Sequence, residues 1–327
     1  MAHWGRDHLE TAETLLRQAG YTVSQLCTSR PSCFDFAARR EKNLIFIKIQ
    51  SDIGNMSLND SQELGEIARN FSAASLLIGE EAREKPLEDD TIYRRHNILA
   101  VTTRTFENVV LYNVRPLIQA SPGGYYVEIN GEALKQRRQE MGLSVGEMAD
   151  MVSMSRRTVY GYERGLAKAS VSAAYNMIWA LGIPVAKPVD IFQESRTRRK
   201  QCILTTARSV FAKNRFLNMI LRRLAPLHVT SVKKAPFDFV LTVPEGKARI
   251  IGGVVDSNEQ ELNRRVNEIL SVSKIVKAHP ILITESQGLR KKDIQCISSE
   301  EFSRIGGPED MIANFKQASS DASLFRP

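Results

Sequence analysis

The sequence lacks the features that mark several common classes of protein. Among its 327 residues, no apolar run approaches the roughly 18–20 residues of a membrane span, and no tract is of low complexity. Only four cysteines occur, none in a CxxC pair and none with a histidine at ligand spacing: Cys27, Cys33, Cys202 and Cys296. We therefore expect no metal site, and free thiols in a reducing, cytoplasmic compartment.

Sequence fingerprints of nucleotide binding and of common hydrolases are missing as well. There is no GxGxxG motif and no P-loop, and the pair Gly252-Gly253 lacks the rest of a phosphate cradle. The five histidines are scattered, and no nucleophile elbow is present. The polar N-terminus, MAHWGRDHLE, does not read as a signal peptide. We expect no cofactor, no catalytic residue and no enzymatic activity.

Positive charge is in excess, and it is unevenly distributed. The net charge is +8, and the segment 195–223 contains nine basic residues and no acidic one. A basic balance of this size favours a polyanionic partner. The densest part of the segment is either an arm that lies along phosphates or a solvated hinge. Its basic residues are Arg196, Arg198, Arg199 and Lys200.

The stretch 131–183 carries the signals of consecutive short helices. A basic helix is expected to end at Gly142, and a second to begin after Ser144, which forms a capping box with Glu147. A third begins after Ser155 and closes on Glu163-Arg164-Gly165. Two short helices joined by a tight turn, the second with basic residues at its N-terminus, are typical of proteins that insert a helix into the major groove of DNA.

The same stretch resembles the Cro/repressor-type DNA-binding domain. The resemblance implies that Arg138 and Glu163 form a structural ion pair between the first and third helices. Three departures stand out: Val145 replaces a frequent Gln, Ser153 replaces the usual turn glycine, and Gly161 lies inside the third helix. Apolar residues at helical spacing are expected to form the core. They are Met148, Ala149, Val159, Tyr162 and Leu181.

The remaining exposed side chains are the candidates for DNA contact. Arginine can pair with guanine O6 and N7, and each such contact discriminates by ~1–3 kcal/mol, whereas phosphate contacts carry no sequence information. We expect the third helix to contact bases or phosphates, the second helix to cross the backbone, and the outlying lysines and arginine to bind phosphates. The candidates are Ser144, Val145, Ser155, Arg156, Arg157, Thr158 and Tyr160, with Lys135, Arg137, Lys168, Arg196, Arg198, Arg199 and Lys200.

Segments on either side of this stretch resemble one another. In both, residues 15–80 and 221–285, the pattern predicts a helix, a strand, a strand ending near Phe-Asp-Phe, a strand, a helix and a strand; the motif lies at 34–36 and at 237–239. Their apolar runs indicate buried strands. We therefore expect two copies of one α/β domain. The polar stretch 80–95 is expected to be a surface loop.

The first copy resembles the restriction-endonuclease-like pattern, in which an Asp is followed by Glu-x-Lys. In that family the carboxylates hold Mg²⁺ and the Lys assists the attack on phosphate. Here Asp35 and Lys48 match, but Phe46 stands at the second carboxylate. In the second copy Asp238 remains, while Ile250 and Gly252 are expected at the other positions. Both copies are therefore expected to be degenerate scaffolds, unless a carboxylate from elsewhere, such as Glu66 or Glu80, supplies the missing ligand.

The expected fold is α/β plus all-α. Its parts are an α/β domain over 1–120, an all-helical Cro/repressor-type domain over 121–194, a basic linker over 195–205 and a second α/β domain over 206–327. Over its whole length, through FDFAARR, LIFIKI and RRTVYGYERG, the chain resembles an archaeal family of HTH-type transcriptional regulators with a central Cro/repressor-type domain.

The resemblance implies a transcription regulator that binds double-stranded DNA. A homodimer is expected because one recognition helix reads too few base pairs for genomic selectivity. The flanking domains are the expected dimer surfaces. Three alternatives stay open: a nuclease or DNA-processing enzyme, a structure-selective DNA binder, and a protein-interaction module. The sequence does not indicate the operator, the direction of regulation or a small-molecule effector.

Overall fold

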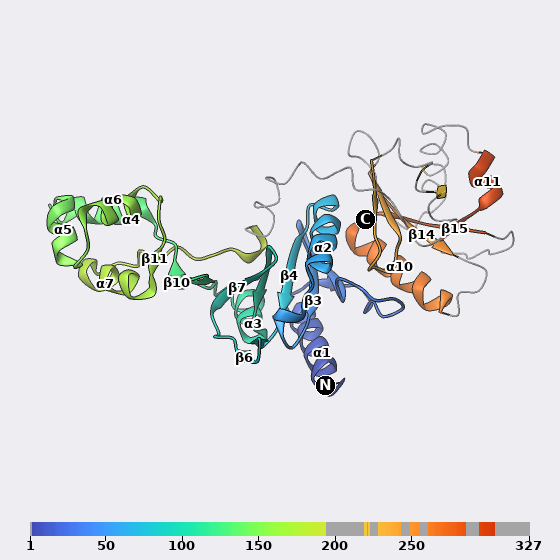
Figure 1. Ribbon diagram of the computed structural model, residues 1–327, viewed down its shortest axis with the longest axis horizontal. Helices are drawn as coiled ribbons and strands as arrows, with labels where there is room; N and C mark the ends of the chain where they lie inside the picture. Colours follow the sequence, from blue (N-terminus) through green and yellow to red (C-terminus); the bar gives the residue numbers. More distant parts are fainter. Residues whose placement is uncertain are drawn as a thin grey trace. The chain divides into compact units, whose positions relative to one another are not determined.

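Residues 2–193, 219–220, 222, 228–242, 249–255, 261–285 and 294–304 are described by a computed structural model (Figure 1). The chain divides into two units. Residues 1–15, 50–56 and 76–195 make the first, and residues 16–49, 57–75 and 196–327 make the second. The domain boundaries expected at residues 120, 194 and 205 remain predictions, and the basic linker lies outside the described residues. No helix among the described residues is long and apolar enough to cross a membrane.

The first unit contains a mixed sheet whose strands lie in the order β4-β8-β7-β9-β10-β11. β4 (Ala74–Ile78) is parallel to β8 (Ile98–Val101), while β7 (Thr91–Arg95) is antiparallel to β8 and parallel to β9 (Ile118–Ser121). α1 (Ala2–Gln18) begins in this unit, and α3 (Thr103–Leu111) follows β8 with Thr102 as its N-cap. Short elements complete it: η1 (Ile53–Asn55), β5 (Glu81–Ala82) and β6 (Lys85–Pro86).

The stretch expected to be a loop at 80–95 contains β7, so that expectation is wrong there. Thr91 and Ile92 are buried at the start of β7, and the polar residues that follow are half-buried. A strand that places few apolar residues in the core gives a weak sequence signal.

A four-helix segment belongs to the same unit: α4 (Gly131–Glu140), α5 (Val145–Met151), α6 (Arg156–Glu163) and α7 (Val171–Leu181) (Figure 1). The two-residue strand β11 (Ala169–Ser170) pairs with β10 (Gly124–Val127), and Val127, Ile129 and Ala169 share the helices' core. The segment is therefore not all-helical, because these strands close part of its core.

The second unit contains β1-β2-β3 and, from the far end of the sequence, the sheet β12-β13-β14-β15-β16. The bounds of its first group are β1 (Thr22–Val23), β2 (Phe36–Arg40), β3 (Asn43–Ile49) and α2 (Leu58–Asn70). The bounds of its second group are β12 (His228–Ser231), β13 (Phe239–Thr242), β14 (Arg249–Val255), α10 (Leu262–Val276), β15 (His279–Thr284), β16 (Gln295–Ser298) and α11 (Ser299–Arg304).

These two groups repeat the same pairing. β1–β2 and β2–β3 are antiparallel, as are β12–β13 and β13–β14, and a helix follows the third strand of each group. In both groups, the Asp of Phe-Asp-Phe immediately precedes the second strand, whereas the sequence predicts a strand that ends near this motif. The side chain of each Asp accepts a hydrogen bond at 2.6 Å from a backbone N–H of the third strand, Ile49 for Asp35 and Val254 for Asp238.

Candidate nucleic-acid interface

The second and third helices of the four-helix segment begin at serines that cap them. Ser144 accepts a hydrogen bond from Glu147 N at 3.2 Å, and Glu147 Oε2 accepts one from Ser144 N at 2.7 Å. These bonds form the predicted capping box, and hydrogen bonding of the Glu147 carboxylate to the side chain and to the backbone of Ser144 lowers the pKa of Glu147. Ser155 accepts from Thr158 N at 3.1 Å and fixes the first turn of α6. The hydroxyls of Ser144 and Ser155 are thus already engaged in helix capping.

The turn between these helices is as tight as the sequence implied. Ser153 adopts a φ of 56°, in the left-handed region that a glycine would enter without strain. Met154 N donates to the carbonyl of Ala149 at 2.8 Å and closes the turn. The third helix ends at Glu163 with Arg164 as its C-cap, and Gly165 follows with a φ of 65°. The C-cap is therefore Arg164 and not Gly165, which was expected there; Gly165 takes the next position, in the left-handed conformation that favours glycine.

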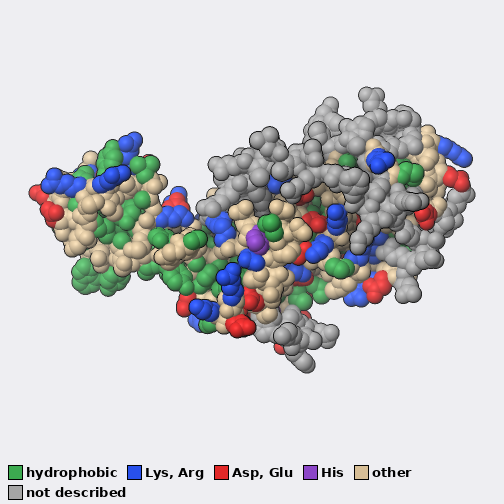
Figure 2. Space-filling model, in the orientation of Figure 1, with side chains coloured by type: hydrophobic (Ala, Val, Ile, Leu, Met, Phe, Trp, Pro, Cys, Tyr) green, Lys and Arg blue, Asp and Glu red, His purple; other side chains and the backbone are tan. Residues whose placement is uncertain are grey.

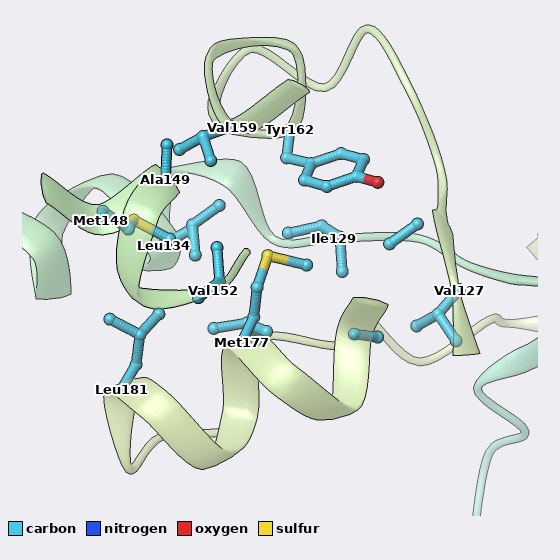
Figure 3. Packing of buried hydrophobic residues seen from close by; sticks show 13 residues of the cluster. Val127, Ile129, Leu134, Met148, Ala149, Val152, Val159, Tyr162, Met177 and Leu181 are labelled. Carbon is cyan, nitrogen blue, oxygen red and sulfur yellow. The ribbon is translucent and has the colours of Figure 1, made fainter. Parts of the chain in front are cut away.

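An apolar core fixes which face of α6 is free. Val159 and Tyr162 of α6 point into the same apolar cluster as Met177 and Leu181 of α7, which also contains Leu134, Met148 and Ala149 (Figure 3). This confirms the predicted core residues. Val145 packs half-buried against this cluster, so its side chain is part of the packing.

A buried ion pair ties α4 to α6, as the resemblance implied. Arg138 Nε donates to Glu163 Oε1 at 2.6 Å, and Nη2 donates to Oε2 at 3.2 Å. The remaining Nη1 donates to the carbonyl of Leu143 at 2.8 Å. The bonds to Glu163 raise the pKa of Arg138. Because both side chains are about nine-tenths buried, at 10% and 6% exposure, they hold the helices together and are not available to DNA.

The free face of α6 presents Arg156, Arg157 and Tyr160, which are all exposed, with Thr158 half-exposed. The guanidinium of Arg156 lies against α5: a Cβ added at Gly146 would come within 2.9 Å of Arg156 Nε. Gly146 therefore leaves the space that this guanidinium occupies, a role that its sequence context did not indicate. Tyr160 accepts a hydrogen bond from Arg164 Nη1 at 2.8 Å, and Arg164 also stacks over its ring.

Arg164 is a further surface cation, which the sequence indicates only as part of the helix end. Its spacing of four residues from Tyr160 places the two side chains on the same face of a helix and is the sequence signal for their contact. Figure 2 shows Lys and Arg side chains gathered on the side of the segment that carries α4 and α6, and hydrophobic ones on the side of α7. The latter side exposes Trp179 by 81% and Tyr175 by 64%. The cationic and apolar faces of the segment are therefore separate.

The outlying cationic candidates differ in their surroundings. Lys135 is exposed on α4. Arg137 donates to the carbonyl of Leu181 at 2.9 Å and also lies 3.4 Å from Glu140. Lys168 donates to the side chain of Gln119 in β9. Arg137 and Lys168 are thus partly engaged within the protein. The remaining four candidates lie outside the described residues: Arg196, Arg198, Arg199 and Lys200.

The nuclease-like residues of the first group meet, but as an ion pair. Lys48 Nζ lies 2.8 Å from Asp35 Oδ1 and also donates to the carbonyl of Ser32 at 3.0 Å. Burial raises the pKa of Asp35, against the opposing effect of Lys48. Phe46, at the second carboxylate position, is fully buried. Glu80 is engaged with Thr103 N and Oγ1.

These residues do not fit a divalent cation. Mg²⁺ needs oxygen ligands from more than one carboxylate or from substrate. Asp35 has its oxygens bonded to Lys48 and to Ile49 N, and the described residues contain no group of three His, Cys, Asp or Glu that could hold a metal. No metal-dependent step can be derived from this arrangement.

In the second group the strand register corrects one expectation. Phe239 faces Gly252 as Phe36 faces Ile47, so the positions equivalent to Phe46 and Lys48 are Ile251 and Gly253, one residue beyond those expected. The cation comes instead from α10: Arg265 Nη2 lies 2.5 Å from Asp238 Oδ2. Arg30 Nη1 lies 2.7 Å from Asp238 Oδ1. Asp238 is thus neutralised by two arginines, neither of which is in the strand.

Comparisons with known proteins match both parts of this description. Residues 6–116 match the PD-(D/E)XK superfamily domain, and residues 134–187 match the family described as helix-turn-helix. A protein of Methanococcus vannielii named "Putative HTH-type transcriptional regulatory protein" is 31% identical over 319 residues, covering 93% of this chain and 95% of its own. Proteins of the same name from Methanocella arvoryzae and Methanosarcina acetivorans are 31% and 27% identical. They cover 93% and 91% of this chain, and 94% and 92% of their own. No solved structure matches.

Proposed function

Because the chain belongs to this archaeal family of HTH-type transcriptional regulatory proteins, we propose that it is a regulator that reads a specific sequence of duplex DNA with α6. The observation that carries the proposal is the division of α6 into two faces. Val159 and Tyr162 are buried in the core, while Arg156 and Arg157 are exposed on the first turn. An exposed helix with arginines at its N-terminus suits the major groove, where a guanidinium can pair with guanine.

The contacts that give affinity are distinct from those that give specificity. The N-terminal end of α6 favours phosphate through the helix dipole, and Lys135 adds an exposed charge nearby in the sequence. Arg137, Lys168 and the basic cluster 196–200 are proposed to contact phosphates. Each phosphate that is neutralised contributes a slope of about −0.9 to the dependence of log K on log salt. The capping serines support α5 and α6. The backbone N–H of Ser144 is bonded to Glu147, so of the two serines we keep only Ser155 as a candidate for phosphate contact through its N–H.

A homodimer is part of the proposal. One recognition helix contacts few base pairs, so two half-sites about one helical turn apart supply the selectivity that a genome requires. Light scattering of the protein, free and bound to DNA, measures its oligomeric state and tests this proposal. A monomer that protects a single continuous site at micromolar concentration contradicts it.

We further propose that residues 206–327 are a second, degenerate copy of the nuclease-like domain and that neither copy is an enzyme. The shared strand pairing and the equivalent bonds of Asp35 and Asp238 to the third strand support the duplication. The buried Phe46 and the cations on both aspartates support the absence of catalysis.

A DNA-processing or structure-selective role is the second candidate, and the match to the PD-(D/E)XK superfamily favours it. Incubation with nicked, branched and duplex DNA in the presence of Mg²⁺ distinguishes it. Cleavage by the wild-type protein that disappears in Asp35→Asn supports DNA processing. If no DNA is cleaved and all sequences are bound with equal affinity, a DNA-binding role without sequence preference is supported.

The decisive experiment selects genomic fragments bound by the purified protein near 150 mM salt with excess competitor DNA. Wild type is compared with Arg156→Ala/Arg157→Ala and, as a matched control on the same segment, with Lys135→Ala. Enrichment of a short inverted repeat that the double variant loses and the control keeps supports sequence reading. If the double variant and neutralisation of 196–200 weaken preferred and random DNA equally, the base-reading proposal is wrong.

A further inference from the structure

The two groups of the second unit contact each other through the loops that precede Phe-Asp-Phe. The carboxylate of Glu268, on α10, accepts hydrogen bonds from the backbone N–H groups of Thr28 and Ser29 at 2.9 and 2.8 Å. Glu63, on α2, accepts from the backbone N–H groups of two consecutive residues in the other loop, Lys233 and Lys234. Each glutamate lies on the helix that follows the third strand of its group, so the same contact is made twice, in opposite directions.

Each loop also forms an ion pair with the other group, through acids that are not equivalent in the two groups. Arg30, in the first loop, pairs with Asp238 at 2.7 Å, and Lys234, in the second loop, pairs with Asp60 of α2 at 2.5 Å. α10 packs on β2, and α2 packs on the equivalent strand β13. Cys33 N donates to the carbonyl of Lys234 at 2.8 Å, so the two loops also bond directly to each other.

At the centre of this contact, equivalent residues meet. Phe34 and Phe237 are the first residues of the two Phe-Asp-Phe motifs, and both are fully buried. Their ring centroids lie 6.3 Å apart. In a symmetric dimer, a residue on the two-fold axis contacts its own copy. The contact of Phe34 with Phe237 is what such an axis produces when both copies belong to one chain.

We propose that the two α/β groups form an intrachain counterpart of a homodimer. In it, the surface of loop 24–34 and α2 binds the equivalent surface of loop 232–238 and α10 without needing the covalent connection. The partner of each surface is therefore the other half of the same chain. This inference rests on the proposed duplication but not on DNA reading, so the test below can fail while the selection experiment succeeds.

The pairing also accounts for the state of Asp238. In the second group, Arg30 of the first group supplies one of the two cations on Asp238. The carboxylate that a nuclease would use is consequently enclosed by the pairing. An interface that places charged groups in contact must neutralise them, because an unpaired buried charge is costly.

The test uses the full chain with a specific protease site inserted between residues 195 and 205. After cleavage, the two halves are expected to elute together on gel filtration with the same mass as the uncleaved protein and an unchanged circular dichroism spectrum. Separation of the wild-type halves as two folded species at micromolar concentration overturns the proposal. An intact chain that is already dimeric, and whose halves exchange between differently tagged copies, overturns the intrachain form of it.

A charge swap identifies the surface involved. Lys234→Glu places a third carboxylate beside Asp60 and Glu63, and it is expected to weaken association of the cleaved halves by tenfold or more. Asp60→Lys in the same chain is expected to restore association. Lys233→Glu is the matched control, since the side chain of Lys233 is exposed and the change in charge is identical. Equal effects of the two single variants, or no rescue by the swap, contradict this interface. Because Lys234 is on a loop and partly exposed, these variants are expected to fold.

Discussion

Arg265 of α10 forms an ion pair with Asp238, as Lys48 of β3 does with Asp35. Each aspartate accepts a hydrogen bond from a backbone N–H of its third strand and is paired with a buried or half-buried cation from its own group; Asp238 also pairs with Arg30 of the first group. In the first group the cation is on the strand itself. In the second group the equivalent strand residue is Gly253. A Cβ there would lie within 2.9 Å of Ile269 Cδ1 and Leu282 Cδ2 and in ordinary contact with Arg265 Nη2 at 3.7 Å, so apolar packing leaves no space for a side chain on the strand. The ion pair is kept although the residue that supplies it has changed.

Removal of Arg265 is therefore expected to destabilise the second unit. Its side chain is 2% exposed and donates to Asp238 and to the carbonyls of Pro236 and Val254. Arg265→Met leaves these acceptors without that partner, at a cost of about 3–5 kcal/mol in the free energy of unfolding. Urea denaturation followed by circular dichroism measures it. Arg264→Met, next to it and half-exposed, is the control and is expected to change stability by less than ~1 kcal/mol. Equal effects of the two variants would mean that the pair does not contribute to folding.

Local signals were sufficient to predict the helix-turn-helix segment. Helix caps bond to groups only a few residues away in the sequence, so the local sequence is enough to identify them. This holds for Ser144 with Glu147, for Ser155 and for the glycines at helix ends. The core residues followed from helical spacing. The pairing of Arg138 with Glu163, 25 residues away, came from the family resemblance.

Long-range relationships were beyond the sequence for a physical reason. The repeat of Phe-Asp-Phe indicated two similar groups, but nothing local shows that Phe34 contacts Phe237 or that Glu268 binds the loop at Thr28. A glycine at the position of Lys48, expected to be Gly252 and found to be Gly253, indicates the loss of a cation when only the sequence is considered, because the replacement, Arg265, comes from a helix and depends on tertiary packing. The register in the second group was misjudged by one residue, since continuous apolar strands do not fix their own alignment.

The buried pair between α4 and α6 leads to a prediction for the helix-turn-helix segment. Arg138→Met is expected to cost about 3 kcal/mol of stability because it leaves Glu163 buried and without this partner. Arg138→Met/Glu163→Met removes both charges and is expected to recover most of that loss. Hydrogen exchange of amides in α4 and α6 measures the local free energy of opening. Lys135→Met, an exposed change on the same helix, is the control. A double variant no more stable than the single variant would show that the arginine acts by packing and not by its charge.

The capping box leads to a prediction about pH. The pKa of Glu147 is lowered in the folded protein by its bonds to Ser144, so its contribution to stability is present above the usual pKa of Glu. It is lost as pH falls through the lowered value. Glu147→Gln keeps an acceptor oxygen but does not titrate. Protection factors of α5 amides should therefore favour wild type near pH 6, and the difference should shrink toward pH 3. Glu132→Gln, in the first turn of α4, separates the capping bonds from the helix dipole. A difference that is constant with pH would refute this account.

The last prediction concerns Gly146, whose missing side chain leaves space for the guanidinium of Arg156. Gly146→Ala improves helix propensity by up to ~1 kcal/mol. It also places a methyl group within 2.9 Å of Arg156 Nε, so this flexible side chain must move. We therefore expect Gly146→Ala to be at least as stable as wild type. If Arg156 reads a base, the variant should nevertheless lose its preference for the selected sequence, as Arg156→Ala is expected to do.

Fluorescence anisotropy with selected and random duplexes measures that preference. Gly161→Ala is the matched control, because its added methyl group meets only Ala167 Cβ at 4.0 Å. The control should gain stability without disturbing Arg156. An unchanged ratio of affinities in Gly146→Ala would show that the position of Arg156 over α5 is not the one used on DNA. Specificity would then have to come from Arg157 or from outside the first turn of α6.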